Sequence, residues 1–581
     1  MPSSRTSLPQ PAAAVDADQA VAHTLLNCLL REVSARERQT AVADGRLLLR
    51  LPRTGVLLRI ALRRTSLIGA HRFTGPVSEQ DPRTGAWTEV PWRALADRID
   101  RELRLRTGVS NDEFLSQVAS SHAGVRAALA HQADRPEEPG GSGDAARPGQ
   151  RADPYLASEQ SLVFGHRFHP TPKARTGSLE QWRRYAPESA ARFPLHHLAV
   201  RRALVRQEAA GPHALAVLDR QRAVPEGYRL LPAHPWQYAM LGDHPALRAA
   251  LARGDILDLG PGGRDFAPTA SVRTLYDGRD FLKFSLQVRI TNCLRKNADY
   301  ELSGAVALTR LLEPAAADLA ARFDGCELLR EPAYRTLDLG DRRLLEGFGV
   351  IVREGLAARL RPGLTALLAA AVADEYPTGP AHVSRLLDGA GPRAALAWWQ
   401  TYLRLLLPPV LAAYFDHGVV LEPHLQNVLI GVDGSGAPRQ VLLRDLEGTK
   451  LLPDRHRAAL AALPRAVAGP LTYDPARGWD RVVYCLLVNH VAELLAALAD
   501  LHPELEPELW TAVRQVLAER CAAHGRPPEL TALLAGAPLP AKANLLTRWA
   551  RRADRDAGYV RIANPLAPEL LSEAARTVAD H

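Results

Sequence analysis

Two histidines and a lysine gather in the segment GHRFHPTPKARTG at residues 165–177: His166, His169 and Lys173. Pro170 and Pro172 lie among them, and proline fixes its φ angle and lacks a backbone N–H. The segment is therefore expected to be a stiff loop that presents these side chains. Zinc binding is disfavoured, because the segment has no cysteine and Arg167 adds positive charge. Donation of hydrogen bonds to phosphate fits these residue types better.

Lysine is scarce in this chain. Of 72 basic residues only five are lysine: Lys173, Lys283, Lys296, Lys450 and Lys542. A compact ammonium group and a planar guanidinium are not interchangeable. A lysine kept in an arginine-rich chain can therefore mark a position that arginine does not fit, although chance is the alternative for any single one.

A strict alternation of apolar and polar residues runs through PTASVRTLYDGRDFLKFSLQVRITNCLRKNADY, residues 268–300. Asp277-Gly278 predicts a turn between two strands. On the second strand one face is polar: Lys283, Ser285, Gln287, Arg289 and Thr291. If the connection has an odd number of residues, Arg273 lies opposite Lys283, and a polyphosphate is the obvious anion to separate the two cations. A half-solvated strand is the simpler alternative.

The second strand is expected to end at Thr291, and Thr291-Asn292 could cap a helix that carries Arg295 and Lys296. The N-terminus of such a helix would offer free N–H groups and positive potential to a phosphate or a carboxylate. A plain helix cap is compatible with the same residues.

A second hairpin is predicted at 419–447, where two strand-like runs flank the turn DGSGAP. Polar side chains stand at the ends that such a hairpin brings together: Glu422, His424 and Asn427 before it, and Asp445 and Glu447 after it. Carboxylates at one sheet end suit Mg²⁺, which binds protein carboxylates together with substrate phosphates. A satisfied polar cluster is the alternative.

The composition limits the classes of function. The chain of 581 residues has a net charge of +8, but its basic residues are spread out, without the Lys/Arg block interleaved with aromatics that is typical of a nucleic-acid surface, so no nucleic-acid partner is expected. No apolar run is judged long enough to span a bilayer, so no association with a membrane is expected.

Five scattered cysteines without a CxxC pair favour a reducing, cytoplasmic environment. Nucleotide-binding motifs GxxxxGK[ST] and GxGxxG and the GxSxG elbow are absent.

The pattern of elements predicts an α+β protein with a helix-rich C-terminal half. In the N-terminal part, helices are expected at 15–36, 92–104 and 112–131 and a hairpin at 45–64. We divide the chain into an N-terminal α/β domain at 1–132, a Pro- and Gly-rich insert at 133–150, a mixed α/β domain at 151–310 and a helix-rich domain at 311–581.

Six motifs together resemble the NRPS-independent siderophore synthetases, the IucA/IucC or aerobactin synthetase family, and the likeness spans roughly residues 150–450. They are GHxxHPxxKxRxG at 165–177, HPWQ at 234–237, PTxSxRT at 268–274, KFSLxxxITNxxR at 283–295, EPHxQN at 422–427 and RDLEG at 444–448. One departure is Arg167, where many members have proline.

The resemblance implies a cupped-hand fold of thumb, fingers and palm, and a homodimer. It implies ATP- and Mg²⁺-dependent adenylation of a carboxylate of citrate or a citrate derivative, then transfer to an amine or hydroxyl with release of AMP and pyrophosphate. ATP would be bound by His166, Ser271, Arg273, Thr274, Lys283 and Asp445. The acid would be bound by Thr291, Arg295 and His424, and Mg²⁺ by Glu422 and Asp445. Arg295, His424 and Lys283 would be the catalytic residues.

Two other classes of function fit parts of the sequence. The His417-Gly418, Asn427 and Asp445 pattern looks like that of small-molecule phosphotransferases of the aminoglycoside-kinase type, but Val419 stands where their catalytic Asp is expected. A non-catalytic citrate- or siderophore-binding protein would suit the cationic strand, but it gives no role to the carboxylates of the second hairpin.

Overall fold

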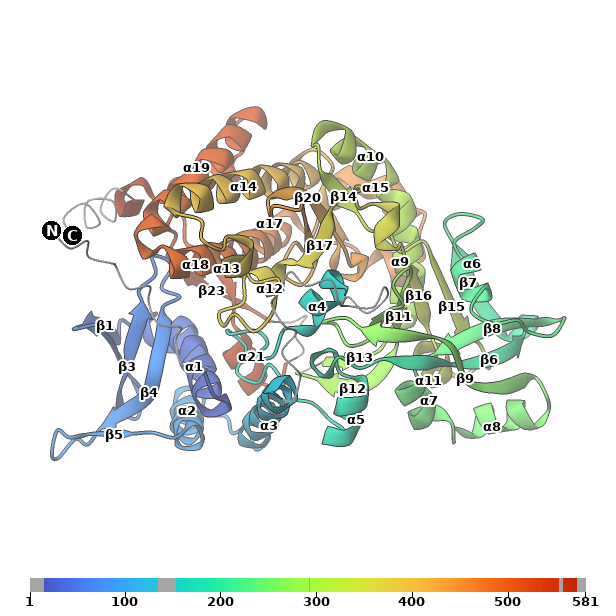
Figure 1. Cartoon of the computed structure of the whole chain (residues 1–581), viewed down its shortest axis with the longest axis horizontal. Helices are drawn as coiled ribbons and strands as arrows, with labels where there is room; N and C mark the ends of the chain where they lie inside the picture. The colour runs from blue at the N-terminus through green and yellow to red at the C-terminus, as the bar shows by residue number, and fades with distance from the viewer. Residues whose placement is uncertain (1–14, 134–152, 292, 553–556, 572–581) are drawn as a thin grey trace, which may run out of the picture.

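The computed structural model describes residues 15–133, 153–291, 293–552 and 557–571. Helices and sheets are mixed along the chain in an α+β arrangement of three lobes (Figure 1). The expected insert at 133–150 lies almost wholly outside the described residues. The sequence of elements matches the predicted class, including the helix-rich C-terminal half.

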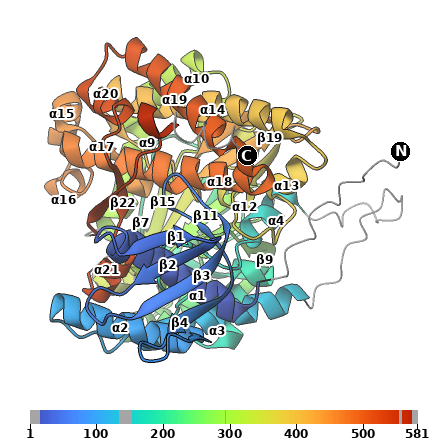
Figure 2. The same cartoon turned by 90° about the vertical axis from the view of Figure 1, so that its left-hand side faces the viewer.

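The N-terminal lobe packs helices against one face of an antiparallel sheet of order β1-β2-β3-β4-β5 (Figure 2). Its helices are α1 (Ala17–Leu29), continued by the π-helical segment η1 (Leu30–Ser34), α2 (Trp92–Thr107) and α3 (Phe114–Ala133). Its strands are β1 (Thr40–Ala43), β2 (Arg46–Arg50), β3 (Leu57–Arg64), β4 (Arg72–Gln80) and β5 (Trp87–Glu89). The predicted helices and the 45–64 hairpin are confirmed.

The middle lobe is built on an eight-stranded sheet of order β7-β15-β16-β11-β10-β9-β6-β8. Its strands are β6 (Phe193–Arg201), β7 (Val205–Ala209), β8 (Tyr228–Ala233), β9 (Ile256–Pro268), β10 (Thr274–Tyr276), β11 (Phe281–Phe284), β15 (Ala333–Leu337) and β16 (Val350–Arg353). Helices α7 (Pro235–Leu241), α8 (Pro245–Ala252) and α9 (Asp299–Leu311) belong to the same part of the chain. Because β15 and β16 come after residue 310, this sheet extends beyond the predicted domain limit.

The expected opposition of Arg273 and Lys283 is wrong. Tyr276 pairs with Phe281, so the connection holds four residues, and Thr274 faces Lys283. The extra residue is accommodated because Asp277 Oδ1 accepts the backbone N–H groups of both Arg279 (3.0 Å) and Asp280 (2.8 Å).

The long alternating strand is divided at Ser285 into β11 and β12 (Leu286–Ile290). The predicted alternation holds for Leu282, Phe284, Leu286 and Val288, which are buried. Lys283 and Ser285 on the opposite face are buried as well, so the half-solvated alternative does not describe that part of the strand.

The helix expected after Thr291 is also absent. Residues Cys293–Arg295 form strand β13, which returns along β12 so that Arg295 pairs with Leu286. Thr291 has a φ of 57° at the turn. Hairpin pairing satisfies the backbone here, and the next helix, α9, begins only at Asp299.

The C-terminal lobe combines long helices with a sheet of order β14-β20-β19-β17. Its strands are β14 (Cys326–Leu328), β17 (Thr365–Leu368), β19 (Val428–Val432) and β20 (Pro438–Leu443). The helices include α12 (Ala369–Val372), α14 (Pro392–Phe415), α19 (Glu506–Ala523) and α21 (Asn544–Trp549), and β22 (Leu539–Lys542) pairs with β23 (Tyr559–Ile562). The predicted hairpin at 419–447 is confirmed as β19–β20.

The prediction that no apolar run is long enough to span a bilayer is wrong, because one continuous helix in this lobe, Pro475–Leu501, is long and apolar enough by length and composition. It comprises α17 (Pro475–Val483), the π-helical segment η6 (Tyr484–Val491) and α18 (Ala492–Leu501). Its most apolar window is 94% buried inside the protein, as in the core helix of a globular fold.

A buried charge network joins the three lobes around Arg167. Its guanidinium contacts Glu375 Oε2 (3.1 Å) and Glu493 Oε2 (3.4 Å), and donates to the carbonyl of His71 (2.8 Å) and to Asn27 Oδ1 (3.2 Å). The arginine that departs from the family pattern therefore serves as an ion-paired link between lobes.

We expect Arg167→Ala to destabilise the protein by about 3 kcal/mol or more, because it leaves Glu375 and Glu493 buried with less compensation. The exposed Arg63, which has a single 3.4 Å pair with Asp500, is the matched control, and Arg63→Ala should cost at most about 1 kcal/mol. Thermal and urea unfolding of both variants provide the measurement. Equal losses would contradict the linking role of Arg167.

Candidate functional site

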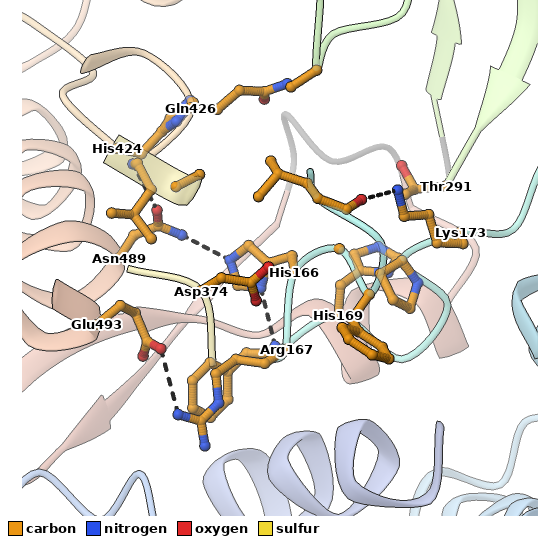
Figure 3. Close-up of a pocket in the computed structure, with 18 of the residues that line it drawn as sticks. His166, Arg167, His169, Lys173, Thr291, Asp374, His424, Gln426, Asn489 and Glu493 are labelled. Atoms are coloured by element: carbon orange, nitrogen blue, oxygen red, sulfur yellow. Dashed lines mark hydrogen bonds and ion pairs between the residues drawn. The ribbon is translucent and has the colours of Figure 1, made fainter. Parts of the chain in front are cut away.

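A cavity of about 480 Å³ lies where the three lobes meet. Its lining residues come from α1 and η1, from the loop at 162–175, from β12–β13, from 370–376, from 422–426, from η6 and from β22. Figure 3 shows His166, Asp374, His424 and Asn489 gathered around this space.

The cavity brings together half of the predicted site residues. His166, Thr291, Arg295, Glu422 and His424 line it. The other half does not line it: Ser271, Arg273, Thr274, Lys283 and Asp445. The sequence motifs therefore contribute to two adjoining places.

The second place is a buried ion cluster of three cations and three acids: Arg273, Lys283, Arg353, Glu331, Asp445 and Glu447. Lys283 Nζ lies 2.7 Å from Asp445 Oδ1 and 2.8 Å from Glu447 Oε2, and Glu447 Oε2 lies 2.6 Å from Arg273 Nη2. The anion between the two cations is thus the protein's own carboxylate. With equal numbers of charges, the ion cluster is compensated internally.

The charges of this cluster stabilise one another. Lys283 is only 1% exposed, and burial opposes its charge, but Asp445, Glu331 and Glu447 together raise its pKa above the ordinary value. Burial likewise opposes the charge of Glu447, yet Lys283 and Arg273 lower its pKa to about 2. Both Lys283 and Glu447 therefore keep their charges at neutral pH.

A strained loop connects the ion cluster to the cavity. Ser271 Oγ accepts the N–H of Thr274 (3.1 Å), while Ala270 and Val272 on either side line the cavity. Val272 has a φ of 68°, a left-handed conformation that a β-branched residue rarely adopts. Asp445 in the ion cluster is similarly unusual, with a φ of 72°. Strain of this kind is typical of functional segments.

The two predicted site histidines are uncharged at neutral pH. Burial, assisted by His169 and Arg31, lowers the pKa of His166 to about 3, and burial also lowers the pKa of His424. The amide of Asn489 lies 2.7 Å from His166 Nε2. These rings can therefore donate or accept hydrogen bonds but do not supply positive charge.

Three cations facing the cavity have no acidic partner among the residues that the structure describes: Arg31, Arg295 and Lys542. Arg31 is 8% exposed, and its guanidinium lies 3.1 Å from the centre of the Phe168 ring. Burial lowers the pKa of Arg31 to about 10. Arg295 makes only a 3.5 Å contact with Thr291 Oγ1. The site is therefore prepared for an anion.

Sequence reasoning missed Arg31 and Lys542 as parts of the site. Arg31 lies in an ordinary-looking amphipathic stretch, one arginine among many. Lys542 is one of the five lysines, and the scarcity of that residue was the only signal that could have marked it.

A magnesium centre made by the protein alone is not formed within the described ranges, where no three His, Cys, Asp or Glu side chains are grouped to hold a metal. Glu422 lies 2.8 Å from Arg481, and Asp445 lies 2.7 Å from Lys283. Both expected ligands are thus already paired with cations.

Lys173 also differs from its expected role. Its Nζ donates to the carbonyl of Leu162 (2.6 Å) and lies 3.5 Å from Glu188. This lysine borders the cavity, but its ammonium is engaged with the protein.

Comparisons with known proteins agree with the motifs. Residues 154–374 match the IucA / IucC family, and residues 396–557 match a family described as ferric iron reductase FhuF-like transporter. The rhizobactin siderophore biosynthesis protein RhbC of Rhizobium meliloti is 30% identical over 94% of this chain and 96% of its own length. The spermidine-citrate ligase of Bacillus anthracis is 29% identical over 72% of this chain and 74% of its own.

Among solved structures, ATP-bound aerobactin synthetase IucA of Klebsiella pneumoniae matches with a TM-score of 0.81 and 26% identity, covering 95% of this chain and all of that one. The petrobactin biosynthesis protein AsbB of Bacillus anthracis shares the fold with a TM-score of 0.73 at 18% identity, covering 97% and 96%. Given this agreement over nearly the whole length, the chain belongs to the IucA/IucC family of siderophore synthetases.

Proposed function

We propose that this protein is an ATP-dependent ligase that adenylates a carboxylate of citrate, or of a citrate derivative, and joins the acyl group to an amine or hydroxyl. AMP and pyrophosphate would be released. The observation that carries the proposal is the set of cations without acidic partners, Arg31, Arg295 and Lys542, facing one cavity of a chain that belongs to this family.

Charge explains why such a cavity suits the reaction. Citrate carries three carboxylates and ATP carries a polyphosphate, so both need cations when they leave water. Phosphoryl chemistry of this kind depends mainly on positioning and charge neutralisation. Adenylation then turns a poor leaving oxygen into AMP, a good leaving group. None of these steps requires a nucleophilic residue of the protein.

The assignment of residues follows their places. Arg295, Thr291 and His424, which share the cavity, are proposed to hold the acid. His166 and the segment with Ser271, Arg273 and Thr274 are proposed to face the nucleotide. Lys283 and Asp445 are proposed to support that segment from the adjoining ion cluster. A Mg²⁺ ion would take most of its ligands from phosphates and water, because Glu422 and Asp445 are already ion-paired.

The choice of nucleophile is supported by the named relatives. They include a spermidine-citrate ligase and an L-2,3-diaminopropanoate–citrate ligase of Staphylococcus aureus, the latter 32% identical over 60% of this chain and 63% of its own length. Both names describe amines joined to citrate. A phosphotransferase or a non-catalytic binding protein has no comparable support.

The products of ATP consumption test the reaction type. We expect citrate-dependent formation of AMP and pyrophosphate, and capture of the activated acid as a hydroxamate when hydroxylamine is added. Chromatography of the nucleotides and a pyrophosphate assay provide the measurement. Formation of ADP instead would favour a phosphotransferase, and absence of turnover with bound citrate would favour a binding protein.

Replacement of Arg295 tests the acid site. Arg295→Ala should raise KM for citrate about 10- to 100-fold, the loss expected for a charge-assisted hydrogen bond of about 1.5–3 kcal/mol, with little change in KM for ATP. Arg289→Ala removes an exposed arginine of the same hairpin outside the cavity and should leave both constants unchanged. An equal rise of both KM values in Arg295→Ala would argue against a specific role in binding the acid.

Two variants separate a nucleotide role of Lys283 from its role in the ion cluster. Lys283→Met leaves three acids with two cations and should both destabilise the protein and raise KM for ATP. In the double variant Lys283→Met/Glu447→Gln the charges balance again, so thermal stability should largely return while KM for ATP stays high. Recovery of activity together with stability would limit Lys283 to a structural role.

A further inference from the structure

Asp374 is an exception among the acids that line the cavity. Six acids do so, and five of them contact a basic side chain: Glu159 with Arg444, Glu188 with Arg175, Glu375 and Glu493 with Arg167, and Glu422 with Arg481. Within the described part of the chain, Asp374 has no basic side chain within ion-pair distance. Figure 3 labels Asp374 among the side chains that line this cavity.

The protein holds the carboxylate of Asp374 only loosely. Its Oδ1 accepts the backbone N–H of Tyr376 at 3.5 Å, and its Oδ2 accepts the hydroxyl of Thr378 at 3.5 Å. Both distances are at the outer limit of a hydrogen bond. The backbone N–H of Glu375 also acts on this carboxylate, which has about four lone pairs and so keeps acceptor capacity for a ligand.

The nearest protein ammonium does not fill this gap. Lys173 donates to the Leu162 carbonyl at 2.6 Å and faces Glu188, which also accepts from Arg175 at 2.7 Å. A cation that pairs with Asp374 must therefore come from outside the protein. An ammonium group meets this requirement, whereas a neutral alcohol brings no positive charge to the partly buried carboxylate.

We infer that Asp374 binds the ammonium group of the nucleophile and accepts its proton, so that the enzyme selects a cationic primary amine over an alcohol. The inference rests on the proposed function, since it requires an acyl adenylate as the partner of the amine. In this arrangement the cations Arg31, Arg295 and Lys542 bind the anionic acid and nucleotide. The carboxylate of Asp374 binds the cationic amine.

The proposed step balances. The carboxylate of Asp374 takes one proton from R–NH₃⁺, and the lone pair of the resulting amine attacks the acyl carbon of the adenylate. The C–N bond forms while the C–O bond to AMP breaks, and its electron pair leaves with the AMP phosphate. The nitrogen then gives up its surplus proton to solvent, which leaves a neutral amide.

The surroundings of Asp374 suit a proton acceptor. Burial and the neighbouring charge of Glu375 raise the pKa of Asp374 to about 7, against the lowering effect of backbone hydrogen bonds from Tyr376 and Glu375 and of the charge of Lys173. A general base with a pKa near the working pH is effective, because it is both available and able to hold a proton. The position of Asp374 at the cavity, without a basic side chain within ion-pair distance, independently supports its role as the group that binds the amine.

The test uses Asp374→Asn, which preserves shape and removes the negative charge. Citrate-dependent ATP–pyrophosphate exchange and trapping by hydroxylamine, a small and uncharged nucleophile at neutral pH, should stay within about twofold of wild type. Amide formation with 1,3-diaminopropane, putrescine and spermidine should lose about 100-fold or more in kcat/KM for the amine, the usual share of a general base. Asp374→Glu, which keeps the carboxylate, should recover part of this loss.

Asp388→Asn serves as the matched control, since it removes the same charge from an exposed position outside the cavity. It should leave all three assays unchanged. Unchanged amide formation in Asp374→Asn, or a parallel loss of exchange and hydroxamate formation, would overturn the inference. If wild type itself shows no citrate-dependent exchange, the proposed function fails first, and the inference fails with it.

Discussion

Arg167 holds Glu375 and Glu493 at the point where all three lobes meet, and the cavity exists beside that contact. A buried pair of acids is costly unless a cation compensates it, so the network fixes which surfaces face one another. The same rule governs the adjoining ion cluster, where Glu447 separates Arg273 from Lys283. Pairing is so thorough around the site that the few unpaired charges become informative.

Those unpaired charges define the chemistry more sharply than the motifs do. Lys283 looked like a phosphate ligand because it stands on a polar strand face, yet it is balanced by neighbouring acids. Arg31 belongs to no motif, yet it is buried at the cavity without an acidic partner among the described residues. Whether a cation is available to a ligand depends on its three-dimensional neighbours, and a linear sequence does not record them.

Local patterns nevertheless predicted much of the architecture. The α+β class, the N-terminal helices and the β19–β20 hairpin follow from periodicity and turn residues, which act over a few positions. The wrong predictions concern strand register and the structure after Thr291, where one residue more or less in a turn changes which residues pair. One additional residue in the Asp277–Asp280 loop moved Arg273 out of register with Lys283, and hairpin pairing took Arg295 out of the expected helix. The six motifs located the site region, but five of the ten site residues that they implied lie outside the cavity wall.

Both π-helical segments, Leu30–Ser34 and Tyr484–Val491, border the cavity, through Arg31 and Asn489 respectively. A π-turn amounts to an α-helix with one residue inserted, and each residue advances a helix by about 100°. Removing one residue from either segment would rotate the flanking helix faces relative to each other, so that either the cavity residues or the core residues would turn away from their partners. A deletion of one residue in either helix should therefore disturb the binding site, even where the deleted residue does not touch the cavity.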